Sequence, residues 1–463
     1  MEEKTAWNEA EFAGIKLGDE RLNVRAIKLL GQLSAQPQAY INQACEDWAA
    51  SKAAYRFFDN DQVEPAKILA PHYQQTAARM AQHPVILALQ DSSELNYRSH
   101  LQTTGLGPIG STQQEQKGLL LHTTLAVTPA GLPLGLLTQQ VWARPQQVRQ
   151  PQSQHKAMAL ADKESAKWLT ALEATQEQIP PGVQVVTVAD READIYEFLL
   201  NAEKQQLSYV VRAAQDRRLM IAQQTLWQHL QSCPVVGQLT VEVAEKKKEA
   251  ARTAIVNVRY REVEVRPPQR LKKLRLEGWK AVRVWAVYVT EEDPPEKVTP
   301  LEWMLLTNVD VSDFDSAIER VAWYVCRWLI ELYFKILKSG CRVEQCLLAS
   351  GQRLKRYLAL MGVVAWRLFW LTYFQRQNPE ASCRSILTEA EWQALYCRVK
   401  KTIELPEQEP TVREVVRWIA QLGGFLGRKH DGEPGITVIW RGWQRLQDIA
   451  AMWRLLNSPL TYG

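Results

Sequence analysis

Residues 183–213, VQVVTVADREADIYEFLLNAEKQQLSYVVRA, decide the fold class. Their first part, VQVVTVAD (183–190), is a short apolar run that ends in an acid, which predicts a buried strand. The middle part, EADIYEFLLNAEKQ (192–205), has apolar residues at helical spacing, and SYVVRA (208–213) again has the composition of a strand. A strand, a helix and a strand in succession predict an α/β layer architecture.

The preceding residues extend this unit with further strands. PVILALQD (84–91) is a second apolar run that ends in an acid. Residues 119–127 and 132–143 flank the turn sequence TPAG (128–131), so they predict a hairpin. Residues 155–175 have helical spacing. The resulting order, three strands, helix, strand, helix and strand, fits a ribonuclease-H-like core.

Residues 236–300 have a different pattern. The runs VNVRYREVEV (256–265) and AVRVWAVYV (281–289) alternate with a period of two. Charged loops separate such runs, with Lys246–Lys248 in one and RLKKLR (270–275) in another. The segment therefore predicts a β-rich insertion in the α/β domain.

The remaining residues return to strand and then to helix. LEWMLLTN (301–308) predicts a strand, and residues 316–339 predict a long helix closed by Gly340. Helical spacing then continues towards the carboxyl end. The chain is thus expected to form an α/β ribonuclease-H-like catalytic core with a β-rich insertion, flanked by helical amino- and carboxy-terminal domains. The expected boundaries are 1–75, 76–372 (insertion about 236–300) and 373–463.

Composition excludes several classes of protein. The net charge of +5 permits a nucleic-acid partner without requiring one. The amino-terminal sequence MEEKTAWNEAEF lacks the apolar segment of a signal peptide. The most apolar run, 357–374, is shorter than a typical membrane span and contains Arg367, so it predicts a buried or interface helix. The seven cysteines include no Cys-x-x-Cys pair, which argues against a zinc site and a disulfide framework.

The first 80 residues predict helices with basic side chains between the apolar positions. One interpretation is a small helical bundle with a solvated basic face. The other is a module that recognises the end of a DNA. The spacing favours neither of them. The candidate recognition residues are Arg21, Arg25, Lys28, Lys52, Tyr55 and Arg56.

Two predicted strands end in an acid, Asp91 and Asp190. Ligands and catalytic groups in α/β sheets tend to lie at strand ends. An isolated aspartate after a strand is more often a turn or cap residue, so each acid alone is a weak signal.

The predicted long helix sharpens this signal. At roughly 100° per residue, Tyr324, Arg327, Glu331 and Lys338 share one stripe about 60° wide. The rest of the helix is mostly apolar, which predicts burial, and polar groups on a buried helix must face a partner, a cleft or a ligand. An intrahelical salt bridge between Arg327 and Glu331 would explain two of the four residues only.

The spacing Tyr-x-x-Arg-x-x-x-Glu-x-x-x-x-x-x-Lys resembles the signature of bacterial cut-and-paste transposases with an Asp-Asp-Glu site. These transposases form the insertion-sequence-four family, and the chain is most similar to its Tn-five group. VADREADIYEFL and LALQDSSELNYR resemble the second and first aspartate motifs of the family. Further similar segments extend the resemblance over nearly the whole chain: AYRFF, KESAKWL, YVVR, LEWMLLTN and LGGFLGRK.

The resemblance implies a DNA transposase of the bacterial cytoplasm with no membrane partner. Such an enzyme binds the inverted repeats at transposon ends, cleaves both strands through a hairpin and joins the 3′-OH ends to target DNA. Two Mg²⁺ ions per active site, with Mn²⁺ as a substitute, would be held by Asp91, Asp190 and Glu331. Carboxylate oxygens suit such hard cations, and paired metals about 3.5–4 Å apart serve in-line phosphoryl transfer.

The resemblance also implies roles for other residues. Tyr324, Arg327 and Lys338 would grip a DNA phosphate, with Arg212 and Arg191 as further phosphate contacts. Trp303 would stack on a base that leaves the duplex when the hairpin forms, and Trp328 would support the extruded strand. Core packing is the alternative for both tryptophans. The carboxy-terminal helices would join two copies in a homodimer that bridges two DNA ends.

Two other functions remain open on the sequence. The first is a catalytically silent protein that binds DNA ends without cutting them. The second is a ribonuclease-H-like nuclease without strand transfer. The presence of all three acids argues against the first, and Trp303 together with the full-length resemblance argues against the second.

Overall fold

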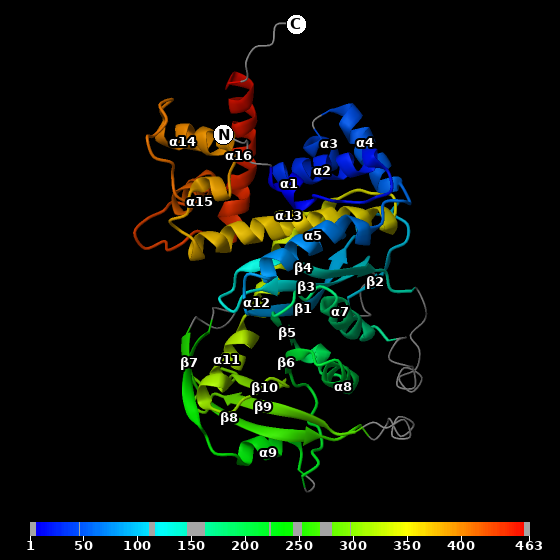
Figure 1. Ribbon diagram of the computed structural model, residues 1–463, viewed down its shortest axis with the longest axis vertical. Helices are drawn as coiled ribbons and strands as arrows, with labels where there is room; N and C mark the ends of the chain where they lie inside the picture. Colours follow the sequence, from blue (N-terminus) through cyan, green and yellow to red (C-terminus); the bar gives the residue numbers. More distant parts are fainter. Residues whose placement is uncertain are drawn as a thin grey trace.

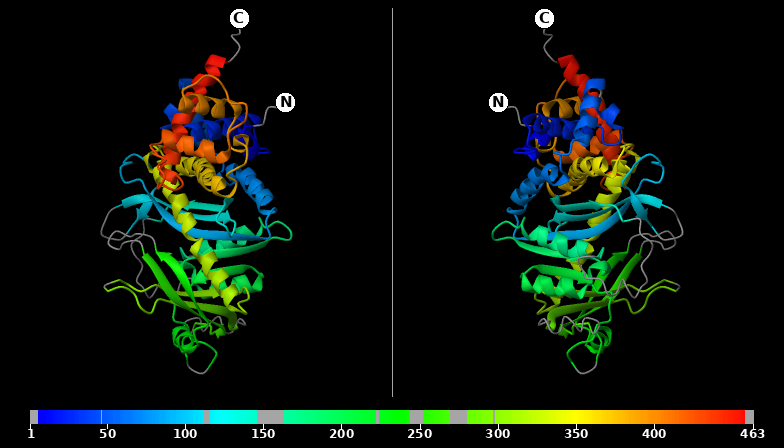
Figure 2. Two further views of the ribbon diagram at one scale, coloured as in Figure 1. Left: turned by 90° about the vertical axis from the view of Figure 1, so that its left-hand side faces the viewer. Right: turned by 90° about the vertical axis from the view of Figure 1, so that its right-hand side faces the viewer.

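The computed structural model of the protein describes residues 6–45, 47–110, 116–145, 163–221, 224–243, 252–268, 280–296 and 298–457. A mixed sheet with helices on both faces forms the centre of the molecule (Figure 1). The amino-terminal and carboxy-terminal helices gather at one end, both on the same long helix (Figure 2). The arrangement confirms the predicted α/β core between two helical parts.

The sheet is made of apolar strands whose side chains are buried in a large core on each face and in a smaller third core that includes Ile86 and Ala126. The strands are β1 (Val85–Asn96), β2 (Gly107–Ile109), β3 (Gln116–Val127), β4 (Pro133–Trp142), β5 (Gln184–Ala189), β6 (Ser208–Arg212), β7 (Gly237–Val243), β8 (Arg252–Val265), β9 (Val282–Thr290) and β10 (Glu302–Thr307).

The strand order is β2-β3-β1-β5-β6-β10-β9-β8-β7, with β4 also paired to β3. Strands β1, β5 and β6 are parallel neighbours, and the predicted hairpin is the antiparallel pair β3–β4. Strands β7 to β9 continue the sheet beyond β10, so the predicted β-rich insertion extends the central sheet. Its charged loops at Lys246–Lys248 and 270–275 lie outside the described residues.

Two sets of helices cover the sheet. One face packs against α7 (Ala166–Gln176), α8 (Tyr196–Lys204) and α9 (Leu226–Ser232). The opposite face packs against α11 (Phe314–Val325), α12 (Trp328–Lys335) and α13 (Gly351–Gln377). Helix α5 (Pro65–Met80) packs against β4 and α13. Because successive side chains of a strand point to opposite faces, strands such as β5, β6 and β9 contribute to the cores on both faces.

The remaining helices form the two end regions. The amino-terminal ones are α1 (Trp7–Glu11), α2 (Glu20–Ala35), α3 (Ile41–Ala44) and α4 (Trp48–Asp59). The carboxy-terminal ones are α14 (Glu389–Lys400), α15 (Val412–Leu422) and α16 (Ile436–Asn457). The two regions touch, since Nε1 of Trp443 donates to the carbonyl of Ser34 at 2.9 Å.

Helix α13 is long and apolar enough to cross a membrane, but 83% of its most apolar window is buried inside the protein. It packs against β4, α2, α4, α5, α15 and α16. The apolar run at 357–374 therefore belongs to a core helix, as predicted.

Three predicted elements have different limits in the structure. Strand β1 continues past Asp91, because its pairing with β3 runs on to Asn96, so the expectation that Asp91 ends its strand is wrong. The amphipathic helix after Asp190 begins only at Tyr196, since a 3₁₀ turn, η2 (Arg191–Ala193), precedes it. The helix expected over 155–175 begins at Ala166 in the described residues.

The helix predicted over 316–339 is divided. Between α11 and α12 the hydrogen bonds tighten, because the N–H of Leu329 donates to Cys326 and that of Ile330 to Arg327, three residues back. After α12 the chain forms a π-helical turn, η4 (Ile336–Gly340). The single α-helical register assumed from the sequence therefore holds only in part.

Two helices cross the expected domain boundaries. Helix α5 passes through residue 75 without a break, and α13 passes through residue 372. Both pack on the sheet as well as on the end regions. The boundaries at 75 and 372 stay predictions.

A buried cluster of charged groups joins the amino-terminal helices to the sheet. Glu11 of α1 accepts hydrogen bonds from both terminal nitrogens of Arg79, each at 2.9 Å, and from Nδ1 of His72. On the other side of the ring, Nε2 of His72 accepts the backbone N–H of Leu136 in β4 at 2.9 Å. Because Nε2 is an acceptor, His72 is the neutral tautomer with its proton on Nδ1.

We expect this cluster to make the protein sensitive to acid. Burial favours the neutral form of Glu11, but the hydrogen bonds from His72 and Arg79 outweigh it and lower the pKa to about 2 from 4.5. A carboxylate with a lowered pKa stabilises the fold above its unfolded pKa, and the contribution is lost as the pH falls towards the folded value. The stability difference between the wild type and Glu11→Gln should therefore shrink by about 2 kcal/mol from pH 5 to pH 3.

Urea unfolding at both pH values measures this difference. The exposed residue Glu64, directly before α5, supplies the control variant Glu64→Gln. A difference for Glu11→Gln that stays constant between pH 5 and pH 3 would contradict the assigned network.

Candidate active site

Asp91 lies in the middle of β1, on the sheet face that packs against α12. Its Oδ1 accepts the backbone N–H of Ser92 at 2.7 Å. The pKa of Asp91 is raised from 3.8 to about 6, mainly because burial disfavours the charged carboxylate. The charges of Asp190 and Glu331 act in the same direction, whereas Arg327 opposes them. The three acids predicted from the sequence are thus close enough to influence one another.

Asp190 follows the last residue of β5 and caps the turn η2. Its Oδ1 accepts the backbone N–H of Glu192 at 2.9 Å. Strands β1 and β5 are parallel neighbours, with Leu89 beside Val188. This register places Asp91 and Asp190 at equivalent positions on adjacent strands, two residues beyond that pair.

Arg327 connects the other two acids. One terminal nitrogen, Nη1, donates to Oδ2 of Asp91 at 2.9 Å, and the other, Nη2, donates to Oε1 of Glu331 at 2.7 Å. The intrahelical pair considered in the sequence is therefore present, but the same guanidinium also reaches the sheet. A planar guanidinium presents its donors as a fork, which suits two carboxylates at once.

The donor chemistry of this site fits a divalent cation. Among the described residues, no group of three His, Cys, Asp or Glu side chains is arranged to hold a metal ion as it stands. Arg327 supplies the positive charge between Asp91 and Glu331 instead. All candidate ligands are carboxylates, the ligands that Mg²⁺ and Mn²⁺ accept. Burial is the main cause of the raised pKa of Asp91, and the charges of Asp190 and Glu331, which raise it further, are charges that a cation would compensate.

Tyr324 lies beside this site at the end of α11. Its side chain is buried, its ring centroid is 6.1 Å from that of Trp303, and the guanidinium of Arg327 lies 6.0 Å from the ring. Trp303 is partly buried and packs against the core next to α11. Tyr324 therefore lies next to both Trp303 and Arg327.

The other predicted phosphate contacts are less closely placed. Lys338 lies on η4, where the α-helical angle used to align it with Glu331 no longer applies. Arg212 ends β6 and donates to the backbone carbonyl of Glu302 at 2.8 Å. Arg191 lies exposed on η2, directly after Asp190.

Trp328 is not a core residue. Its side chain is 58% exposed at the first turn of α12, and Val325 at the end of α11 is exposed as well. The expectation that this helix is buried nearly all round is wrong at the junction of α11 and α12. An exposed tryptophan three residues before Glu331 is available to contact a ligand.

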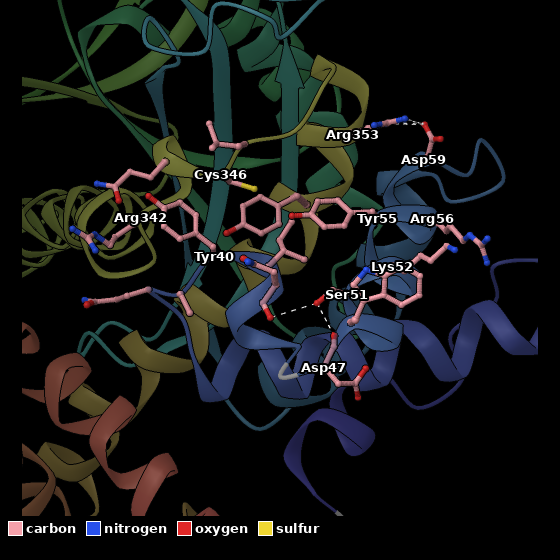
Figure 3. Close-up of a pocket in the computed structure, with 18 residues that line it drawn as sticks. Tyr40, Asp47, Ser51, Lys52, Tyr55, Arg56, Asp59, Arg342, Cys346 and Arg353 are labelled. Atoms are coloured by element: carbon pink, nitrogen blue, oxygen red, sulfur yellow. Dashed lines mark hydrogen bonds and ion pairs between the residues drawn. The ribbon is translucent and has the colours of Figure 1, made fainter.

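A groove of about 960 Å³ lies between the amino-terminal helices and the start of α13 (Figure 3). Three of the predicted recognition residues, Lys52, Tyr55 and Arg56, line it from α4. Its other lining residues, which the sequence did not single out as recognition residues, include Tyr40, Trp48, Arg342 and Arg353. The spacing of WAASKAAYR, which places aromatic and basic residues on one helix, is the local signal that could have revealed Trp48.

An aromatic ring and a basic side chain of this groove are in contact. Trp48 is 75% exposed, and Nζ of Lys52 lies 4.6 Å from the centre of its ring. Exposed aromatic rings beside cations are typical of surfaces that bind nucleic acids.

The recognition residues predicted on α2 lie elsewhere and are not among the residues that line the groove. Arg21 is exposed and pairs with Asp19 at 2.8 Å, and Lys28 is exposed. Arg25 is partly buried, and within the described residues its Nη1 has no hydrogen-bond partner. The structure therefore places the α2 candidates outside the groove that the α4 candidates line.

Three stretches of the chain match known protein families. Residues 4–63 match the family described as transposase DNA-binding, residues 157–367 match the transposase DDE domain, and residues 363–456 match the transposase Tn5 dimerisation domain. Asp190 and Glu331 fall within the second match, whereas Asp91 lies between the first and the second. The amino-terminal, central and carboxy-terminal parts of the fold thus each resemble a different functional domain.

Proposed function

Because this chain belongs to the Tn5-type transposases of the IS4 family, we propose that it frees transposon DNA through a hairpin intermediate and joins the ends to target DNA. The observation that carries the proposal is the convergence of Asp91 and Glu331 on one guanidinium, with Asp190 nearby. A site in which carboxylates surround an arginine fork suits the transfer of a phosphoryl group.

We assign Asp91, Asp190 and Glu331 to two Mg²⁺ ions, for which Mn²⁺ can substitute. When bound, the ions activate the attacking oxygen and stabilise the leaving oxygen. The side chains of the protein bind and orient the DNA. Arg327 exchanges its carboxylate partners for a phosphate of the DNA end, because its fork fits phosphate oxygens as well as carboxylate oxygens.

Further groups hold the DNA around this centre. Tyr324 and Lys338 assist Arg327 at the phosphate, and Arg191 and Arg212 extend the contact. A duplex end that folds into a hairpin must release a base from its stack. Trp303 receives this base, because its partly buried ring lies beside Tyr324 at the phosphate site.

We also assign the partners of the two helical ends. The groove with Lys52, Tyr55 and Arg56 holds the inverted repeat at the transposon end, and the basic residues of α2, including Lys28, contact the same DNA. The last turns of α16 expose Met452, Leu455 and Leu456 within the part that matches the dimerisation domain. An exposed apolar patch of this kind supports a homodimer that brings two ends together in the bacterial cytoplasm.

The test is cleavage of a duplex that carries the terminal repeats of the element, with Mg²⁺ present. We expect hairpinned ends, and we expect Trp303→Ala to slow hairpin formation about tenfold or more while the first nick persists, since base stacking contributes about 1–3 kcal/mol. Denaturing gels separate nicked from hairpinned products. Trp303→Phe is the matched control, because it keeps an aromatic surface.

Each alternative has its own outcome. Binding without any cleavage would identify a silent DNA-end-binding protein. Nicking without hairpins or joining would identify a nuclease without strand transfer. Normal hairpin formation by Trp303→Ala would remove the stacking role from Trp303.

A further inference from the structure

Two adjacent residues of α7 are connected to the two active-site aspartates through intermediate residues. Lys167 is buried on the sheet face opposite to α12, with its side chain 8% exposed. Its Nζ lies 3.2 Å from Oε2 of Glu192. The backbone N–H of Glu192 in turn donates to Oδ1 of Asp190. Lys167 therefore holds the residue that orients the Asp190 carboxylate.

Trp168 makes the corresponding connection to Asp91. Its fully buried ring meets the ring of His122 edge-to-face, with centroids 4.6 Å apart. Nδ1 of His122 lies 2.9 Å from the hydroxyl of Ser92. The backbone N–H of Ser92 donates to Oδ1 of Asp91. Both aspartates are thus oriented by a backbone N–H whose residue is held from α7.

A chain of ion pairs anchors the start of α7 to the same two strands. Arg144 pairs with Glu94 of β1 at 3.0 Å and with Glu164 at 2.7 Å. Glu164 lies 3.8 Å from Nζ of Lys167, which completes the link to Glu192. Charges of alternating sign therefore run from β1, three residues after Asp91, to the turn after β5, two residues after Asp190.

Packing alone does not require a lysine here. The residues Ala171 and Leu172 already bury the apolar side of α7 against the sheet. A buried ammonium group is costly unless it is paired, so an apolar side chain of similar size would hold the helix at least as well. The position of Lys167 instead serves the turn that carries Asp190.

We propose that Lys167 and Trp168 are positioning residues, through which α7 fixes the separation and orientation of Asp91 and Asp190 for their metal ions. This inference rests on the proposed metal role of the two aspartates. Substitution of a residue that orients a metal ligand typically lowers metal affinity or activity 10- to 100-fold, because small displacements of the ligand weaken its bond to the metal. Helix α7 is accordingly part of the active site without touching DNA or metal.

The experiment measures Mn²⁺ binding to the full-length protein by isothermal titration calorimetry, together with kcat and KM for cleavage of a terminal-repeat duplex. For Lys167→Met we expect Mn²⁺ affinity to fall about tenfold or more, and kcat to fall with little change in KM. Lys167→Arg should restore part of both, because it keeps the charge. Glu173→Gln is the control, since this residue lies on α7 but points to Asn201 of α8.

A second variant protects the test against misfolding. Glu192 is 65% exposed and Lys167 keeps Glu164 as a counter-charge at 3.8 Å, so Glu192→Gln should still fold and should lower the Mn²⁺ affinity of the folded protein. Wild-type Mn²⁺ affinity and kcat in both Lys167→Met and Glu192→Gln would overturn the positioning role. Failure of the wild type itself to bind Mn²⁺ or to cut would instead refute the proposed metal role of the aspartates.

Discussion

Glu331→Ala should reduce cleavage of transposon ends by at least about a thousandfold while end binding persists. Removal of one member of a catalytic set that acts as a unit has effects of this order. Glu331 is the acid contributed by α12, and no other acidic side chain on that helix can replace it. End binding should survive, because Lys52 and Arg56 line a groove formed by other elements.

Cleavage is measured on denaturing gels, and binding is measured on the same duplex by mobility shift. Glu319→Ala is the matched control, since Glu319 is an exposed acid on the neighbouring helix α11. If Glu331→Ala still cuts at a rate near that of the wild type, Glu331 has no role in metal binding and the assignment of the three acids is wrong.

Arg327→Met should destabilise the protein in the absence of metal and make it depend on Mg²⁺ for stability. In the structure, Arg327 is the partner of Asp91, whose side chain is 17% exposed, and of Glu331. Without the guanidinium, Asp91 would remain close to two other acids with no cation beside it. Loss of one member of a partly buried ion-pair network costs about 2–4 kcal/mol. The variant should also cleave poorly, because it lacks the fork that grips phosphate.

Calorimetric scans with EDTA and with Mg²⁺ provide the measurement. We expect Mg²⁺ to raise the melting temperature of Arg327→Met more than that of the wild type, since a bound cation replaces the lost charge and stabilises the fold by mass action. Arg398→Met removes an exposed arginine of α14 and serves as the control. Equal Mg²⁺ shifts in the variant and the wild type would show that Arg327 and the metal do not share the same acids.

The local elements of this fold could be predicted from the sequence. Apolar runs of strand length gave β1, β5 and β6, and the turn TPAG gave the β3–β4 hairpin. Asp190 was found because its strand does end there. These signals are carried by neighbouring residues, so no tertiary information was needed.

Features that depend on contacts between distant parts of the chain could not be predicted from the sequence. The limit of β1 depends on its pairing with β3, and Arg327, at the break before α12, contacts Asp91, 236 residues away. No spacing on one helix reveals a contact of that kind. The roles of Lys167 and Trp168 were hidden for the same reason, since their partners belong to other strands and turns.

The buried cluster of Glu11, His72 and Arg79 bears on the engineering of this protein. The stretch that matches the DNA-binding family ends at residue 63, so a chimera that exchanges it would replace Glu11 but keep His72 and Arg79. A donor segment without an acid at the position of Glu11 would leave the partly buried Arg79 without its counter-charge and Nδ1 of the buried His72 without its acceptor. Altered end specificity is therefore better sought by substitutions at the groove than by transplanting the whole amino-terminal segment.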